Sequence, residues 1–185
     1  EKNKYEKILN FIHNEQKELF LTVKNHEIYK LLKKNLKKNK LFKKILKKNN
    51  NFYKKILKEQ KYELIINCDG NNKISRNFFY NKITKSYNSN AYTTIIKHQN
   101  IKNIKAIQIF TKKGPIAFLP ISNSETSIVF SIINKKVILN ENEIKNLINL
   151  HNKNYEIKSF GKLEKFELNF SVSRNYYYKN LMAFG

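Results

Sequence analysis

The residues best placed to do chemistry stand where an apolar run gives way to a turn, at Asp69-Gly70. The run 62–67 (YELIIN) predicts a buried strand, and Cys68-Asp69-Gly70 predicts a tight turn after it. In open α/β sheets, dinucleotides bind at the carboxyl ends of strands, where an aspartate can accept hydrogen bonds from ligand hydroxyls. Glycine lets the backbone approach a ligand closely. The alternative is an ordinary strand followed by an Asp-Gly turn.

A second stretch concentrates residue types that the rest of the sequence avoids. Residues 114–120 (GPIAFLP) contain both prolines and one of the four glycines. Proline and glycine occur in strands only where the backbone requires them. Because the sequence otherwise has few of either, their concentration here indicates a backbone of specific shape. The alternative is a plain strand bounded by turns.

Other catalytic classes find no support in the sequence. Metal-ligand spacing is absent among His13, His26, His98, His151 and Cys68. We interpret each histidine as a surface or core residue. We expect Cys68 to be a packed small hydrophobe at the end of the predicted buried strand. No nucleophile elbow, Walker loop or G-x-G-x-x-G pattern occurs.

The charge is strongly basic, with 37 lysines and arginines against 14 acidic residues and a formal net charge of +23. Such a balance is typical of nucleic-acid binding. However, the only arginines are Arg76 and Arg174, whereas a dedicated binder usually exploits the arginine fork. Lysine, asparagine, isoleucine, tyrosine and phenylalanine, which have A/T-rich codons, are over-used. We therefore interpret the charge as genome bias, which leaves electrostatic attraction to a membrane as a hypothesis.

Around the two stretches, the hydrophobic pattern predicts a chain of strands with few helices. Strands are predicted at 8–11, 19–23, 62–67, 91–97, 105–111, 116–121, 127–133, 165–172 and 181–184. Helices are predicted at 26–38, with Asn25 as its N-cap, and at 141–151, with Asn140 as its cap. In 165–172 we expect Phe166, Leu168, Phe170 and Val172 to share a half-buried side. The order predicts an α/β or mixed α+β fold containing an inserted sheet.

Residues 41–60 give two conflicting predictions. They contain a near repeat, LFKKILKK (41–48) and FYKKILKE (52–59). The apolar residues of both copies have helical spacing, which favours two short basic amphipathic helices.

Together, in their order and spacing, the two stretches resemble the group A flavoprotein hydroxylases, and especially the branch that serves ubiquinone biosynthesis. That family carries D-G-x-x-S-x-x-R after a buried strand and, further along, G-P-x-A-x-L-P-L before another strand. The run 111–132 (TKKGPIAFLPISNSETSIVFSI) resembles the latter. Residues 22–25 resemble the family's strand-to-helix junction, and 181–185 (LMAFG) resembles the approach to its Gly-Asp motif.

The sequence also departs from the family. Lys73 stands where the motif has serine, and Ser75 stands at its apolar position, so we expect the Asp-Gly turn to pack differently. Family members have a strand and hairpin at the place of 41–60. We give the strand-and-hairpin expectation precedence over the helical spacing, because short apolar runs do not distinguish a helix from a strand.

The resemblance implies part of a Rossmann-like FAD-binding domain with an inserted, mostly antiparallel substrate domain. Residues 1–18 would start the substrate-domain sheet, 19–83 would belong to the FAD-binding domain, 84–175 would form the substrate-binding sheet, and 176–185 would return to the FAD-binding domain. The chain would then be an internal fragment, with the Gly-rich FAD fingerprint and the Gly-Asp loop outside it.

The resemblance also implies an activity, the hydroxylation of the aromatic ring of a polyprenyl-phenol ubiquinone precursor. The cofactor would be FAD, with molecular oxygen and NAD(P)H or another external electron donor. The implied FAD-binding residues are Asp69, Gly70, Asn25 and Arg76, and the implied substrate-wall residues are Phe118, Leu119 and Pro120. We identify no acid or base in this chain, and the fragment alone would be inactive.

Location and partners complete these expectations. One cysteine indicates a reducing compartment, and no apolar run approaches the roughly 20 residues that span a bilayer. We expect a cytoplasmic protein, with peripheral contact at the inner membrane and a ubiquinone-biosynthesis complex as hypotheses. Two alternatives stay open: a nucleic-acid-binding domain built on 29–60, and another flavoprotein such as a halogenase or geranylgeranyl reductase.

Overall fold

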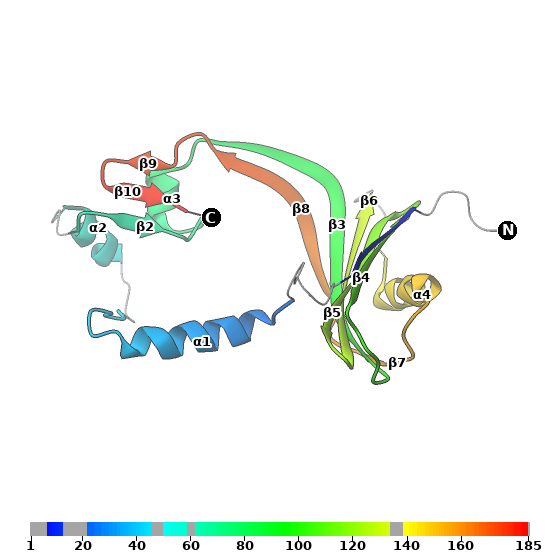
Figure 1. Cartoon of the computed structure of the whole chain (residues 1–185). Helices are drawn as coiled ribbons and strands as arrows, with labels where there is room; N and C mark the ends of the chain where they lie inside the picture. Colours follow the sequence, from blue (N-terminus) through cyan, green and yellow to red (C-terminus); the bar gives the residue numbers. More distant parts are fainter. Residues whose placement is uncertain (1–6, 13–21, 46–49, 59–61, 134–138, 185) are drawn as a thin grey trace. The chain divides into compact units, whose positions relative to one another are not determined.

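The computed structural model describes residues 7–12, 22–45, 50–58, 62–133 and 139–184, which form a mixture of helices and mostly antiparallel strands (Figure 1). The helices are α1 (Asn25–Lys38), α2 (Asn50–Lys58), α3 (Lys73–Phe78) and α4 (Glu141–His151). The strands are β1 (Lys7–Ile12), β2 (Ile65–Asn67), β3 (Lys82–His98), β4 (Lys105–Thr111), β5 (Gly114–Ser122), β6 (Glu125–Ile133), β7 (Ile157–Phe160), β8 (Glu164–Ser173), β9 (Tyr177–Tyr178) and β10 (Leu181–Ala183).

Residue contacts divide the chain into two compact units, and each unit is assembled from two separate stretches of sequence. Unit 1 comprises Glu1–Lys30 and Ser86–Leu168, and unit 2 comprises Leu31–Lys85 and Asn169–Gly185. Strands β3 and β8 each carry the chain from one unit to the other.

Unit 1 is built on an antiparallel sheet with the strand order β1-β4-β5-β6-β3-β7, and β8 also pairs with β3. Helix α4 lies against one face of this sheet (Figure 1), and the core of unit 1 is made of side chains from both. Ile116 of β5 lies opposite Phe130 of β6, and both are fully buried with Ile144 of α4. Burying one such side chain contributes about 1.5–3 kcal/mol. Buried positions alternate along β5 and β6, so one face of these strands is directed to the core.

Asn140 is the N-cap of helix α4, as the sequence predicts, and it forms a capping box with Glu143. The Asn140 Oδ1 atom accepts from the Glu143 backbone N over 2.9 Å, and Glu143 Oε2 accepts from the Asn140 backbone N over 2.8 Å. These reciprocal bonds satisfy two amides that a helix start leaves without partners. The helix therefore starts and ends where its pattern predicts, at 141 and 151.

Gly114 and Pro120 of β5 each have a structural reason. Gly114 has φ +134°, and a Cβ atom there would lie 2.0 Å from the Ser131 carbonyl O on β6. Only glycine tolerates this combination of backbone angle and close approach. Pro120 lies at a register shift between β5 and β6, where a missing amide is tolerated.

Unit 2 contains a small sheet with the strand order β2-β10-β9. Strand β10 runs parallel to β2 and antiparallel to β9. One face of the sheet packs against helices α2 and α3, around a buried cluster of Ile74, Phe79 and Leu181. The parallel pair brings residues 65–67 and 181–183, which are far apart in sequence, into direct register.

Several expectations need correction. The strand-and-hairpin expectation for 41–60 is wrong over 50–58, where α2 is helical and the spacing argument holds. Residues 42–45 have no regular structure, and 46–49 and 59–61 lie outside the described residues. Cys68 is exposed and follows β2 rather than packing in it.

The ends and faces of other elements also differ from the pattern. Of the predicted strand 19–23, residues 19–21 lie outside the described residues, and Thr22 and Val23 are not in a strand. Helix α1 begins at Asn25 itself, one residue earlier than predicted. On the side of β8 that was expected to be half-buried, Leu168 and Val172 are half-buried, whereas Phe166 and Phe170 are 50% and 40% exposed. Helix α3 and strands β7 and β9 were not anticipated.

Candidate functional site

The Asp-Gly loop begins where β2 ends at Asn67, a polar side chain that is 8% exposed. The Asn67 Nδ2 atom donates to Ser75 Oγ over 2.7 Å and to the Asp69 carbonyl O over 3.2 Å. The Asn67 Oδ1 atom accepts from Asn72 Nδ2. One buried amide therefore ties the strand to both ends of the loop, and it leaves none of its hydrogen-bonding groups unmet.

The far end of the loop is closed by the start of α3. The Asn72 Oδ1 atom accepts from the Ser75 backbone N over 2.9 Å, which makes Asn72 the N-cap of the helix. The Ser75 hydroxyl donates to the Asp69 carbonyl O over 2.6 Å. Ser75, one of the two residues that depart from the family pattern, is thus buried and fixes the loop in place.

Asp69 is exposed at the tip of this tethered loop. Its Oδ1 atom accepts from the Asn71 backbone N over 2.9 Å, whereas its Oδ2 atom has no partner in the part of the chain that the structure describes. Gly70 is open, because an added Cβ would meet only the Lys82 Nζ at 4.0 Å. Arg76 Nε donates to the Asn71 carbonyl O over 3.1 Å. The arrangement presents one free carboxylate oxygen and an accessible backbone.

The loop lies at the carboxyl end of a parallel strand pair. Leu181, Met182 and Ala183 of β10 lie opposite Ile65, Ile66 and Asn67 of β2. Beyond that register, the Phe184 backbone N donates to the Asn67 carbonyl O over 3.0 Å. The two strands therefore end side by side, at the kind of sheet edge where α/β proteins bind nucleotides.

The structure brings Asp69, Gly70 and Arg76 together in this loop of unit 2. Asn25, the fourth implied FAD-binding residue, is exposed at the start of α1 in unit 1. The sequence did not single out Asn67 or Asn72, and it noted Ser75 only as a departure from the family pattern. Asparagine is a favoured N-cap residue, and this preference was the available signal for Asn72.

The implied substrate-wall residues are consecutive on β5 and do not share one face. Phe118 is 2% exposed and belongs to the core beneath α4, together with Tyr155. Leu119 is half-buried, and strand alternation directs it to the opposite face of the sheet. Pro120 follows at the register shift.

Unit 1 also holds a buried polar network of His98, Asn103, Thr126 and Tyr155. The Tyr155 hydroxyl donates to Asn103 Oδ1 over 3.0 Å, and Asn103 Nδ2 donates to Thr126 Oγ1 over 2.9 Å. The His98 Nε2 atom lies 2.9 Å from Thr126 Oγ1, and its Nδ1 atom lies 2.8 Å from the Gln99 carbonyl O.

The partners of the network fix its hydrogen-bond directions. Because a carbonyl can only accept, His98 Nδ1 must donate to Gln99, and a neutral ring then accepts the Thr126 hydroxyl proton at Nε2. Burial raises the pKa of the Tyr155 hydroxyl above its usual value. Both ring nitrogens of His98 and the Tyr155 hydroxyl are thus engaged by the protein. The network stabilises the core rather than presenting a reactive group.

Comparisons with known proteins do not assign a family or a function to this chain. Neither protein-family models nor curated proteins show a match to this chain. Within the described residues, no group of three or more His, Cys, Asp or Glu side chains could hold a metal ion. The same part of the chain contains no helix long and apolar enough to cross a membrane.

Proposed function

We propose that the chain is part of an FAD-dependent aromatic hydroxylase of the type that serves ubiquinone biosynthesis. The observation that carries the proposal is the parallel pairing of β2 with β10. This pairing puts the Asp69-Gly70 loop next to Phe184 at the carboxyl edge of the sheet. On this proposal, unit 2 is a portion of a Rossmann-like FAD-binding domain and unit 1 carries the inserted substrate sheet.

The geometry of the loop supports a role in holding the cofactor. Asp69 offers its free Oδ2 atom to a ribityl or ribose hydroxyl, and Gly70 leaves the backbone open to a close approach. The side chains of Asn67 and Ser75 fix the loop through hydrogen bonds, so the loop would lose little conformational freedom when the cofactor binds. Arg76 braces the loop through the Asn71 carbonyl.

When bound, FAD reduced by an external donor such as NAD(P)H would supply the transfer of one oxygen atom from O2 to an electron-rich ring. The residues of this chain would bind and orient. Asp69 would accept a hydrogen bond from a cofactor hydroxyl. The face of β5 that carries Leu119 would contact a polyprenyl-phenol. A lipid-tailed substrate of this kind would bring the protein to the surface of the inner membrane.

Reading the coding sequence on both sides of the chain tests the proposal directly. It requires aspartate immediately after Gly185 and a strand followed by G-x-G-x-x-G upstream of Glu1. Unrelated flanking sequence would overturn it. Nucleic-acid binding that weakens steeply with salt would then be the function to examine.

A second test uses the full-length gene product and its flavin absorbance after purification. Asp69→Asn should weaken FAD retention about tenfold or more, because a hydrogen bond to a charged acceptor contributes about 1.5–3 kcal/mol. Glu63→Gln is the matched control, since Glu63 is also an exposed carboxylate of unit 2. Equal losses in the two variants, or a colourless wild-type protein that takes up no FAD, would count against the proposal.

A further inference from the structure

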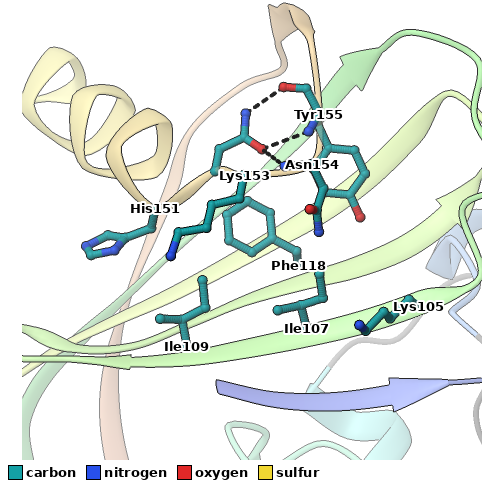
Figure 2. A pocket seen from close by; sticks show the side chains of 9 residues that line it. Lys105, Ile107, Ile109, Phe118, His151, Lys153, Asn154 and Tyr155 are labelled. Atoms are coloured by element: carbon teal, nitrogen blue, oxygen red, sulfur yellow. Dashed lines mark hydrogen bonds between the residues drawn. The ribbon is translucent and has the colours of Figure 1, made fainter. Parts of the chain in front are cut away.

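Unit 1 contains an open cavity of about 180 Å³ between β4, β5 and the turn that follows α4. Figure 2 shows its floor, formed by Ile107, Ile109 and Phe118. All three side chains are buried, at 8%, 3% and 2% exposure. The ring of Tyr155 stacks against Phe118 with centroids 6.0 Å apart and forms a wall. The interior of the cavity is therefore apolar and partly aromatic.

The wall of the cavity is fixed by a single asparagine. The Asn152 Oδ1 atom accepts from the backbone N of Tyr155 over 3.0 Å and from that of Asn154 over 3.3 Å. Asn152 Nδ2 donates to the Tyr155 carbonyl O over 2.7 Å. These bonds, drawn dashed in Figure 2, hold the turn 152–155 in one conformation. A cavity with so rigid a wall would bind a ligand at little entropic cost.

The rim of the cavity carries two lysines. Lys105 lies on β4 and shares a face with Ile107 and Ile109, because alternate residues of a strand point the same way. Lys153 lies in the fixed turn and extends over the floor beside His151 in Figure 2. Among the described residues, neither lysine is in an ion pair. The rim is therefore cationic above an apolar floor.

We propose that this cavity binds a small aromatic carboxylic acid, with its ring on Ile107, Ile109 and Phe118 and its carboxylate at the lysine rim. The size of the cavity supports a single ring, since an apolar protein cavity of about 150 Å³ holds benzene. The charge of the rim favours an anion over a neutral ring. The site lies wholly in unit 1 and does not depend on the proposed flavin chemistry.

The test is an NMR titration of the 185-residue chain with benzoate, at constant ionic strength. We expect a Kd on the order of 1 mM, typical of a ligand with few atoms, and amide shifts concentrated at 105–109 and 151–155. Benzyl alcohol, which has the ring without the charge, and acetate, which has the charge without the ring, should each bind more weakly.

Lysine variants distinguish benzoate binding in the cavity from the general attraction of an anion to a basic protein. Lys153→Gln and Lys105→Gln should each weaken benzoate binding about fivefold, the loss expected for one exposed ion pair. Lys158→Gln, at an exposed lysine outside the cavity, should leave it unchanged. Asn154→Trp, an exposed rim substitution, should cover the mouth and abolish the local shifts.

Three results would overturn the proposal. Equal affinity for benzyl alcohol and benzoate would remove the role of the lysines. Equal affinity for acetate, with shifts spread over many exposed lysines, would show only general anion association. Unchanged binding by both rim-lysine variants and by Asn154→Trp would place the ligand elsewhere.

Discussion

The Phe184 backbone N donates to the Asn67 carbonyl O over 3.0 Å, immediately after the last registered pair of β10 and β2. The side chain of the same Asn67 bonds Ser75 and the Asp69 carbonyl. Asn67 thus joins the parallel strand pair to the Asp-Gly loop, with its backbone on one side and its amide on the other. The shape of the loop depends on a residue that is not itself presented to a ligand.

Asn67→Ala should destabilise the chain by about 1–3 kcal/mol, because it removes the amide that donates to the buried Ser75 Oγ and the oxygen that accepts from Asn72 Nδ2. Urea unfolding measured by circular dichroism would show the change. Asn71→Ala is the matched control, because Asn71 is exposed and its side chain makes no hydrogen bond within the described residues. Equal stability of the two variants would show that the loop does not depend on the Asn67 amide.

Gly114→Ala should be far more damaging than the same substitution at Gly70. The new Cβ would lie 2.0 Å from the Ser131 carbonyl O, at a φ of +134°. Relieving this clash requires β5 and β6 to separate, so we expect a loss of about 3 kcal/mol or more. At Gly70 the nearest atom is the tip of Lys82 at 4.0 Å, so Gly70→Ala should change stability little.

Thermal unfolding of both glycine variants distinguishes these outcomes. A melting temperature of Gly114→Ala within a degree or two of that of Gly70→Ala would mean that the sheet accommodates a side chain at 114. The close packing of β5 on β6 would then not explain why glycine stands there.

The sequence predicted elements well where local signals agree. Residues 105–111 are rich in strand-favouring Ile, Phe and Thr, and 141–151 combine helical spacing with the Asn140 cap, so β4 and α4 have the expected limits. For 50–58, helical spacing was the correct guide and the resemblance was not. Helix α3 has only six residues, too few for a periodic pattern to be recognised.

The candidate site was predictable only in part. The Asp-Gly turn is a local signal, so residues 69–70 could be singled out from sequence. The tether through Asn67 and Ser75 joins residues eight positions apart and depends on the strand-to-helix geometry of the loop. The pairing of β2 with β10 joins Ile65 to Leu181, and no local pattern encodes so distant a contact. The exposure of Cys68 likewise follows from where β2 ends.

The ion pair between Lys24 and Glu125, with Nζ and Oε2 2.6 Å apart, should make stability depend on pH. The hydrogen bond from Lys24 lowers the pKa of Glu125, and the same bond raises the pKa of Lys24. The contribution of Glu125 is therefore present above the unfolded pKa, near 4.5, and is lost as pH falls through the lower folded value. The contribution of Lys24 is present below pH 10.5 and is lost as pH rises through its folded pKa.

Comparing wild type with Glu125→Gln from pH 3 to pH 8 checks this prediction. The wild-type chain should be slightly more stable at pH 7, and the difference should shrink as the pH falls below 4.5 and Glu125 becomes protonated. Glu164→Gln is the control, because its pair with Lys162 is longer, at 3.3 Å, and more exposed. A difference in stability that does not shrink between pH 7 and pH 3 would trace the effect to packing rather than charge.

Tyr155→Phe should destabilise unit 1 by about 1–2 kcal/mol at pH 7, because it leaves the buried Asn103 Oδ1 without its donor. Tyr87→Phe is the matched control, since Tyr87 is 53% exposed in the same unit. Equilibrium unfolding in urea, followed by circular dichroism, measures both variants. Equal losses would mean that the hydroxyl of Tyr155 contributes no more than a solvated one.

The same variant has a pH signature. Burial raises the pKa of Tyr155 above 10.0, so the unfolded chain gives up this proton more readily than the folded chain does. The stability contributed by the protonated hydroxyl is therefore complete below pH 10 and declines as pH rises further. The gap between wild type and Tyr155→Phe should narrow between pH 10 and pH 11. A gap that stays constant would show that Tyr155 ionises alike in the folded and unfolded chains.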